Sequence, residues 1–407
     1  MGSSTSESAD VLIAGAGPAG SATAQLLARA GFRVVVADRA AFPRDKACAD
    51  YLSPEALRML EHLGVLGELE AHAVPLRAIR VTAARGSVLE GAFARAGITA
   101  PRPNGLCIPR RELDLRLVAA ARAAGAVVLE RSAVEDLVQS GSGTGGAVVR
   151  DLATGSLRVI RARLVVGADG LRSVVARRIG RRRHAGGRSV AFVAHLAGID
   201  GPPGTAEMFV GAHGYAGLNP LPDGATNVAL VVAAAGAGAA RGAPEQFFRS
   251  RLAEVPGLGA RVRSAPMMRR ILVTGPFAAR STPVVADGVA LVGDAAEFYD
   301  PFTGDGVCSA LRGAAFLAEA AARALARPGP VKAGALRHYV IERRRAFGGK
   351  WAVERLIRRA MGFPRLFDRA VANAERRGLA HTLIGVAGES LPARAVLNPS
   401  FLARMVL

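Results

Sequence analysis

The sequence predicts an α/β fold: a doubly wound domain with a parallel sheet, an inserted antiparallel sheet and a helical C-terminal region. Three observations support this class. A buried strand, a glycine-rich turn, a helix and a second strand follow one another at residues 10–38. Two later strands, at residues 164–167 and 289–292, each end in a glycine-containing turn. Between and before them lie short β-like runs separated by Gly and Pro, as in antiparallel sheets.

The composition is that of a globular protein. The 407 residues are 50% hydrophobic and 21% charged, which excludes a disordered chain. The three cysteines are widely spaced and form no pattern with histidine, so we expect neither a disulfide framework nor a metal site. The polar opening lacks the features of a signal peptide, and no apolar run reaches the length of a membrane span. These observations favour a cytoplasmic protein.

The formal net charge of +20 comes mostly from arginine. A nucleic-acid-binding protein could have such a charge, but these arginines are spread along the whole chain, and the arginine cluster at residues 177–183 is not interleaved with aromatic residues. We therefore predict solvated helix faces and no nucleic-acid partner. An anionic partner or a peripheral membrane contact stays open as the less favoured alternative.

The N-terminal unit has the pattern of a Rossmann-like dinucleotide-binding turn. Gly15 permits the tight turn, Gly17 permits close approach of a pyrophosphate, and Gly20 permits the helix to pack against the strand. An acid, Asp38, ends the second strand, where it can bind ribose hydroxyls. The candidate cofactor-binding residues of this unit are Gly15, Ala16, Gly17, Ala19, Gly20, Asp38 and Arg39.

Two further motifs indicate which dinucleotide. Residues 164–173 form a strand followed by Gly-Ala-Asp-Gly, and residues 289–296 form a strand followed by Gly-Asp-Ala-Ala. The second leads to Asp-Pro-Phe-Thr-Gly-Asp-Gly at residues 300–306 and then to a helix. With the first turn, these motifs resemble the FAD-dependent oxidoreductases of the para-hydroxybenzoate hydroxylase fold over most of residues 8–330. That family includes flavin monooxygenases, geranylgeranyl-reductase-like enzymes and flavin-dependent halogenases.

The resemblance implies an FAD-binding domain, with NAD(P)H as the reductant. In it, the Asp169 motif supports flavin binding, Asp294 holds the ribityl chain, and the loop at residues 301–306 lies under the flavin ring. Asp305 stands where relatives carry Glu, and its alternative interpretation is a helix-capping acid. The implied cofactor-binding residues of these motifs are Asp169, Gly293, Asp294, Pro301, Gly304, Asp305, Gly306 and Val307.

Three other segments extend the resemblance. The loop at residues 42–54 looks like one that passes close to the flavin in the geranylgeranyl-reductase-like branch, which implicates Lys46 and Cys48. Cys48 is interpreted as a packed or flavin-adjacent thiol and not as a nucleophile. Arg110 matches an arginine near the linker of the cofactor, with Arg111 as the alternative, and Val134 matches a residue that binds adenine through its backbone.

The β-like runs between these motifs predict a second domain, inserted in two pieces, whose sheet covers the flavin and forms a substrate pocket at the interface. The tail is mostly helical, with breaks expected at residues 348–349 and at Pro364 and Pro392. We assign residues 1–77, 104–188 and 283–330 to the FAD-binding domain, residues 78–103 and 189–282 to the substrate domain, and residues 331–407 to the helical region.

The preferred function is an FAD-dependent monooxygenase that hydroxylates or epoxidises a hydrophobic or aromatic small molecule, free or carrier-tethered, in specialised metabolism. His195, His213 and Tyr215 are the candidate catalytic bases. The alternative is a geranylgeranyl-reductase-like alkene reductase. Those enzymes carry an aromatic-x-Trp-x-Phe-Pro stretch, where this chain has Gly217 and Asn219, and we expect this departure to widen the pocket and make it more polar.

A halogenase is less favoured, because the Trp-x-Trp-x-Ile-Pro stretch of halogenases is absent and no lysine lies between Lys46 and Lys332. A flavoprotein without catalytic activity is the remaining alternative.

Overall fold

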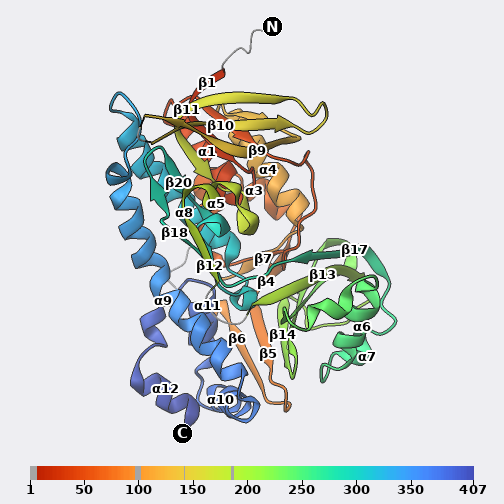
Figure 1. The fold of residues 1–407 in the computed structure, drawn as a ribbon. Helices are drawn as coiled ribbons and strands as arrows, with labels where there is room; N and C mark the ends of the chain where they lie inside the picture. Colours follow the sequence, from red (N-terminus) through yellow and green to blue (C-terminus); the bar gives the residue numbers. More distant parts are fainter. Residues whose placement is uncertain (1–6, 97–101, 142, 185–187) are drawn as a thin grey trace.

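The computed structural model describes residues 7–96, 102–141, 143–184 and 188–407 (Figure 1). Its first sheet has the strand order β19-β20-β11-β1-β2-β8, and β20, β11, β1, β2 and β8 run parallel. These strands consist mostly of buried Val, Leu, Ile and Ala, as expected where helices cover both faces. The strands are β1 (Glu7–Ala14), β2 (Val34–Ala37), β8 (Val127–Leu129), β11 (Leu157–Gly167), β19 (Val285–Ala286) and β20 (Val289–Leu291).

An antiparallel hairpin of β9 (Ser132–Ser140) and β10 (Gly143–Asp151) extends this sheet from the first half of β11. Helices α1 (Pro18–Arg29), α4 (Arg110–Ala123) and α8 (Gly306–Leu325) share one hydrophobic core with β1 and β2. Helix α5 (Val174–Ile179) packs against β11 in the core that lies on the other side. The parallel sheet between helices confirms the predicted fold class.

The second large sheet is mostly antiparallel and has the order β17-β13-β16-β15-β14-β5-β6. Its strands come from two separated parts of the chain, which meet where β14 pairs in parallel with β5. The shared sheet supports our proposal of one domain inserted in two pieces. The strands are β5 (Ala78–Thr82), β6 (Val88–Ala92), β13 (Ser189–Ala197), β14 (Thr205–Gly211), β15 (Gly214–Pro220), β16 (Ala225–Ala233) and β17 (Met267–Thr274).

Smaller elements join the two large sheets or pack against them. Helix α6 (Pro244–Ala253) and helix α7 (Gly259–Val262) cover one face of the second sheet. Helices α2 (Pro54–Leu63) and α3 (Leu66–Glu70) pack beside α4 and α8. The two small sheets contain β3 (Tyr51–Leu52), β4 (Val74–Leu76) and β7 (Gly105–Cys107), and β12 (Arg181–His184), β18 (Ala279–Thr282) and β21 (Glu297–Phe298).

The C-terminal region is helical, as predicted, and contains α9 (Arg337–Met361), α10 (Pro364–Arg376), α11 (Ala380–Ala387) and α12 (Pro399–Val406). Helix α9 runs along one side of the molecule, and α10 and α12 lie at the end far from the parallel sheet (Figure 1). The predicted break at Gly348 and Gly349 is wrong, because α9 continues through both glycines and packs against α8 there. Within the described part of the chain, no helix has the length and apolar character to cross a bilayer.

Side chains of the C-terminal helices complete the edge of the second sheet. The Glu375 carboxylate accepts a hydrogen bond from the backbone N–H of Glu90 in β6, and His381 Nδ1 accepts one from Ala92. An edge strand leaves such N–H groups unpaired, so these contacts fix the helices to the sheet. They also place the apolar faces of α10 and α11 beside the space between the two large sheets.

Candidate functional site

One large cavity, of about 630 Å³, lies where the parallel sheet, the antiparallel sheet and the C-terminal helices meet. Its wall contains the glycine turn after β1, the turns after β11 and β20, and the loop before α8. All three separated sequence motifs therefore lie around a single space. The predicted cofactor residues in its wall are Gly17, Ala19, Arg39, Lys46, Cys48, Arg110, Asp169, Gly293, Asp294, Pro301, Gly304, Gly306 and Val307.

The glycine turn is closed as tightly as the sequence predicts. A Cβ added at Gly20 would lie 1.8 Å from the carbonyl oxygen of Gly15, so only glycine fits. Gly15 itself has a φ of +95°, and a Cβ there would lie 2.7 Å from the carbonyl oxygen of Ala168. Gly17 lines the cavity, so its bare backbone and the start of α1 face the space where a pyrophosphate would bind.

Two arginines converge beside this turn on one buried carboxylate. Arg110 donates to Asp114 through Nε and Nη2, at 3.0 and 2.9 Å, and Arg44 Nη1 lies 3.0 Å from Asp114 Oδ2. A guanidinium nitrogen of Arg44 lies 3.6 Å from the position that a Cβ at Gly17 would occupy. Asp114 thus orients two cations toward the place of a phosphate charge. The sequence analysis missed Asp114, although its spacing of four residues from Arg110 is a readable signal.

Lys46 is the third cation of this region. Its ammonium lies 3.7 Å from the position that a Cβ at Gly170 would occupy, in the turn after β11. Burial lowers the pKa of Lys46, and the charges of Arg110 and Arg44 lower it further. Because burial and the neighbouring arginines disfavour the charged ammonium of Lys46, an anionic ligand in the cavity would be attracted to it and would stabilise its charged form.

Two carboxylates, those of Asp169 and Asp294, also lie in the cavity wall. Asp169 Oδ2 accepts a hydrogen bond of 2.7 Å from the backbone N–H of Val174, whereas its buried Oδ1 has no hydrogen-bond partner among the described residues. Burial raises the pKa of Asp169. Asp294 follows β20 in a turn that Arg182 holds through the Asp294 carbonyl at 2.9 Å. Both side chains can accept hydrogen bonds from ligand hydroxyl or N–H groups.

The chain matches the family described as "FAD binding domain" over residues 8–353. It belongs to this family of FAD-dependent oxidoreductases. It is 33% identical over 318 residues to a menaquinone reductase of Mycolicibacterium smegmatis, covering 74% of this chain and 73% of that protein. It is 29% identical over 325 residues to a digeranylgeranylglycerophospholipid reductase of Methanothrix thermoacetophila, covering 78% of each. Its fold is similar to that of the myxobacterial chondrochloren halogenase, with a TM-score of 0.79 and 23% identity over 98% of this chain and 95% of that one.

The residues of the cavity fit FAD. The bare glycine turn with Arg44, Arg110 and Lys46 suits the pyrophosphate, and the buried, unpaired oxygen of Asp169 suits a donor on the cofactor. Arg110, not Arg111, faces the cavity, since Arg111 is exposed beside Glu112. The contact of Arg110 with the linker of the cofactor stays a prediction, and its position in the cavity wall favours it over Arg111.

Asp38 and Val134 lie outside the cavity wall of the flavoprotein. Asp38 Oδ2 accepts a hydrogen bond of 2.7 Å from the N–H of Ala16, and Oδ1 accepts one from Ala40 at 2.8 Å. Asp38 therefore shapes the glycine turn, and contact with a ribose would use its remaining acceptor capacity. Val134 packs in the core behind the sheet. Contacts of Asp38 with ribose and of Val134 with adenine stay predictions.

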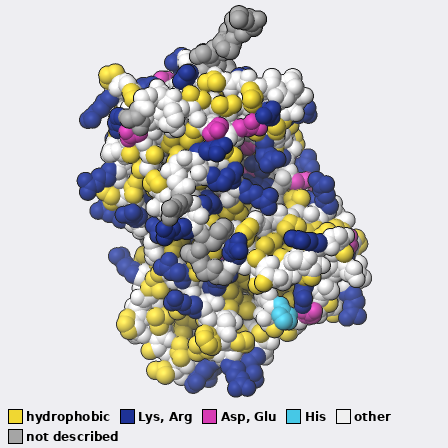
Figure 2. Space-filling model, viewed as in Figure 1, with side chains coloured by type: hydrophobic (Ala, Val, Ile, Leu, Met, Phe, Trp, Pro, Cys, Tyr) yellow, Lys and Arg dark blue, Asp and Glu magenta, His cyan; other side chains and the backbone are white. Residues whose placement is uncertain are grey.

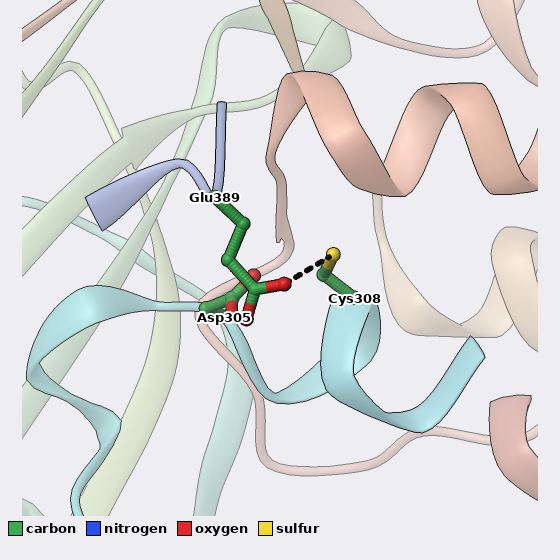
Figure 3. A group of neighbouring side chains, drawn as sticks. All are labelled: Asp305, Cys308 and Glu389. Carbon is green, nitrogen blue, oxygen red and sulfur yellow. Dashed lines mark hydrogen bonds between the residues drawn. The ribbon is translucent and has the colours of Figure 1, made fainter. Parts of the chain in front are cut away.

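Asp305 differs from both of its predicted roles. Its side chain makes no capping hydrogen bond to α8 and does not line the cavity. It is buried in an ion-pair cluster with Lys350, where Glu389 and Cys308 also lie (Figure 3). Burial and the charge of Glu389 raise the pKa of Asp305.

The ligand atoms of Asp305, Cys308 and Glu389 are close enough to surround a metal ion. However, Lys350 pairs with both carboxylates, and Arg312 also pairs with Glu389. These cations already compensate the acids, so we assign the cluster a positioning role. It ties the loop before α8 to α9 and to the end of α11.

The loop at residues 42–54 is fixed through Asp50, which does not cap α2. The cap is Ser53, whose Oγ accepts a hydrogen bond from Ala56. Asp50 Oδ2 instead lies 2.7 Å from His195 Nε2 and accepts a hydrogen bond of 2.6 Å from Asn227 Nδ2. Asp50 Oδ1 accepts a hydrogen bond of 3.1 Å from the N–H of Arg110. Asp50 thus connects the loop, the second sheet and α4.

These contacts separate the three predicted catalytic bases. His195 is paired with Asp50 and does not line the cavity, and His213 is exposed in the turn between β14 and β15. We assign neither histidine to catalysis. Tyr215 lines the cavity, and its buried hydroxyl donates a hydrogen bond of 2.6 Å to Asp300 Oδ1. Arg358 holds the other oxygen of Asp300 at 3.0 Å.

Gly217 and Asn219 both line the cavity, so the greater polarity expected there stays a prediction. The amide nitrogen of Asn219 donates a hydrogen bond of 2.9 Å to the carbonyl of Ala49 and is therefore used within the protein. Met208 lies 3.6 Å from the position that a Cβ at Gly217 would occupy and covers that opening with an apolar side chain. The apolar side chain beside Gly217 is compatible with a long apolar substrate.

Proposed function

We propose that this flavoprotein is a reductase that adds two hydrogens across a carbon–carbon double bond of a prenyl chain in a lipophilic substrate. The observation that carries the proposal is the continuity of the cavity. It reaches from the flavin-binding turns to a wall of aliphatic and aromatic side chains on the second sheet and on α9, α10, α11 and α12. Such a wall binds a long apolar chain and excludes water.

The apolar wall of the cavity is formed by both strands and helices. The second sheet contributes Ile79, Val81 and Val231, and the C-terminal helices contribute Ile357, Phe367 and Leu383. Burying prenyl methylene and methyl groups against such residues stabilises binding by roughly 25 cal/mol per Å² of apolar area. The names of the two relatives support the same substrate class, because both are reductases of lipids that carry prenyl-derived chains.

FAD supplies a two-electron hydride carrier to such a reaction, and NAD(P)H is our proposed source of the electrons. The protein must then deliver a proton to the second carbon of the double bond. Tyr215 meets the requirements of this donor, because it lines the cavity and keeps its proton. Burial and the neighbouring charge of Asp300 raise the pKa of Tyr215 well above its usual value. Asp300 accepts the hydrogen bond from the Tyr215 hydroxyl at 2.6 Å and so fixes the position of that hydroxyl in the cavity wall.

The product of a strictly anaerobic reaction tests the proposal. The FAD-loaded protein is reduced with dithionite and incubated with menaquinone or a geranylgeranyl lipid, and the extracted lipid is analysed by mass spectrometry after re-exposure to air. Alkene reduction predicts a gain of two hydrogens that survives this exposure, whereas a reduced quinone ring would return to its starting mass. A product that requires O₂ and carries its oxygen would instead establish monooxygenation, which the same water-excluding cavity suits.

Tyr215→Phe tests the proton donor. We expect it to retain FAD and to slow lipid reduction by about 10²- to 10⁴-fold, the range for loss of a general acid. Tyr339→Phe is the matched control, because the Tyr339 hydroxyl is also buried and donates at 2.6 Å, but to the carbonyl of Leu291 outside the cavity. Equal rates in the two variants would remove Tyr215 from the mechanism.

A further inference from the structure

The lipid-binding end of the cavity opens between the C-terminal helices. Leu356 of α9, Leu366 of α10 and Val406 of α12 all line the cavity, yet each is about two-fifths exposed. Side chains that belong both to the cavity wall and to the surface mark its opening. Asn373 of α10 donates a hydrogen bond of 3.0 Å to the carbonyl of Met405 of α12, which fixes two sides of this opening relative to each other.

Apolar surface continues outward from the opening. Phe363, in the turn between α9 and α10, is 65% exposed but does not line the cavity. Hydrophobic side chains are visible at the end of the molecule that contains α10 and α12, next to Lys and Arg side chains (Figure 2). A large apolar side chain beside an apolar opening indicates contact with another apolar phase.

The exposed charged side chains around the opening are predominantly positive. Arg355, Arg359, Arg365 and Arg369 are exposed and follow or precede the lining residues of α9 and α10 in the chain. In the described part of the protein, none of these four has an ion-pair partner. Most acids of residues 354–407 are engaged elsewhere: Glu354 and Glu389 lie in the buried cluster, and Asp368 accepts hydrogen bonds from Ser87.

We propose that this opening docks on an anionic lipid bilayer, so that the substrate enters the cavity directly from the membrane. The lipid character of the substrate rests on the proposed function, whereas docking itself does not require turnover. Phe363 and the exposed leucines would enter the interfacial region, and the arginines would contact lipid phosphates. The combination of an apolar opening with unpaired arginines favours a bilayer over a polar protein partner. The proposed docking is peripheral and requires no helix that spans the bilayer.

Vesicle co-sedimentation with the full FAD-loaded chain tests the docking surface. Vesicles of phosphatidylcholine with an equal amount of phosphatidylglycerol should bind the protein, and vesicles of phosphatidylcholine alone should bind it much less. Each arginine near an anionic surface is worth about a fivefold change in partitioning, so Arg359→Gln with Arg365→Gln should weaken binding by about 25-fold. Phe363→Ser should weaken it by about tenfold. High salt should weaken the binding of the wild type.

The control pair is Arg241→Gln with Arg263→Gln. These arginines are also exposed but lie near α6 and α7, away from the opening, so vesicle binding should stay within a factor of about three. All variants should retain the FAD content of the wild type, which shows that they fold. Failure of the wild type to bind phosphatidylglycerol vesicles would overturn the proposal, as would equal weakening by the control pair.

The experiments also distinguish a bilayer from two other possible binding partners of this surface. Self-association that Phe363→Ser abolishes, seen by analytical ultracentrifugation without vesicles, would assign the surface to a second copy of the chain and overturn the proposal. Binding of an acidic acyl carrier protein in place of vesicles would also overturn it. Neither result bears on alkene reduction, because that activity is measured with detergent-dispersed lipid.

Discussion

Asp50 should be a main determinant of stability for the loop at residues 42–54, which lines the cavity. Asp50→Ala leaves three donors without their acceptor, namely His195 Nε2, Asn227 Nδ2 and the N–H of Arg110. A buried donor without a partner costs about 1–3 kcal/mol, although Asn227 keeps a second acceptor in the carbonyl of Cys48. Asp50 also has a φ of 56°, where Ala is strained by roughly 1 kcal/mol. We expect a total loss of about 3–5 kcal/mol in the free energy of unfolding.

Two further variants separate the hydrogen bonds from the backbone strain. Asp50→Asn keeps one acceptor oxygen and tolerates a positive φ, so it should cost only about 1–2 kcal/mol. Asp223→Ala has the same strain, since Asp223 has a φ of 62°, but Asp223 is exposed. It should therefore lose only about 1 kcal/mol. Urea titrations at saturating FAD measure all three. An Asp50→Ala variant that is no less stable than Asp223→Ala would refute the assignment of Asp50 as the connection between loop and sheet.

The remaining predictions concern the cofactor and the buried acids. Gly20→Ala should purify with little or no bound FAD, because its Cβ cannot fit 1.8 Å from an oxygen; Gly67→Ala, with no atom within 4 Å, should keep the flavin absorbance. Asp294→Ala should also lose most of its FAD, and unchanged flavin content would contradict its placement at the cofactor. Burial raises the pKa of Glu354 to about 7, so the folded state holds a proton that the unfolded state releases at lower pH. Because only the unfolded state is ionised between about pH 4.5 and 7, the free energy of unfolding falls as pH rises through this window. The stability of Glu354→Gln relative to the wild type should therefore increase across this window, by at most about 1.4 kcal/mol per pH unit, in thermal melts at pH 5 and 8.

The parts of the fold and site that could be predicted are those with local patterns. The strand, turn and helix around Gly15, Gly17 and Gly20 occupy consecutive residues. The close backbone contacts that require glycine at Gly15 and Gly20 can therefore be expected from the local sequence. The turns ending in Asp169 and Asp294 were equally local. Their meeting in one cavity followed because parallel strands of a sheet bring their carboxyl ends to the same edge.

The parts that could not be predicted depend on contacts between distant residues. Asp50 meets His195 and Asn227 across more than 140 residues, and nothing in its neighbourhood in the sequence indicates those partners. Asp305 has the sequence context of a helix cap, but Lys350 of α9 offers a stronger electrostatic partner. The C-terminal helices carry no motif, so the sequence indicated helices without showing that they line the cavity and border its opening.

The most direct measurement is anaerobic flavin spectroscopy. The FAD-loaded flavoprotein is reduced with one equivalent of dithionite, mixed with a detergent-dispersed geranylgeranyl lipid that has no quinone ring to accept the electrons, and followed by its visible absorbance. Our account predicts that the oxidised flavin spectrum returns without O₂ in proportion to the lipid supplied, and that Tyr215→Phe slows this return. A flavin that stays reduced with every prenyl lipid until O₂ is admitted would contradict the account.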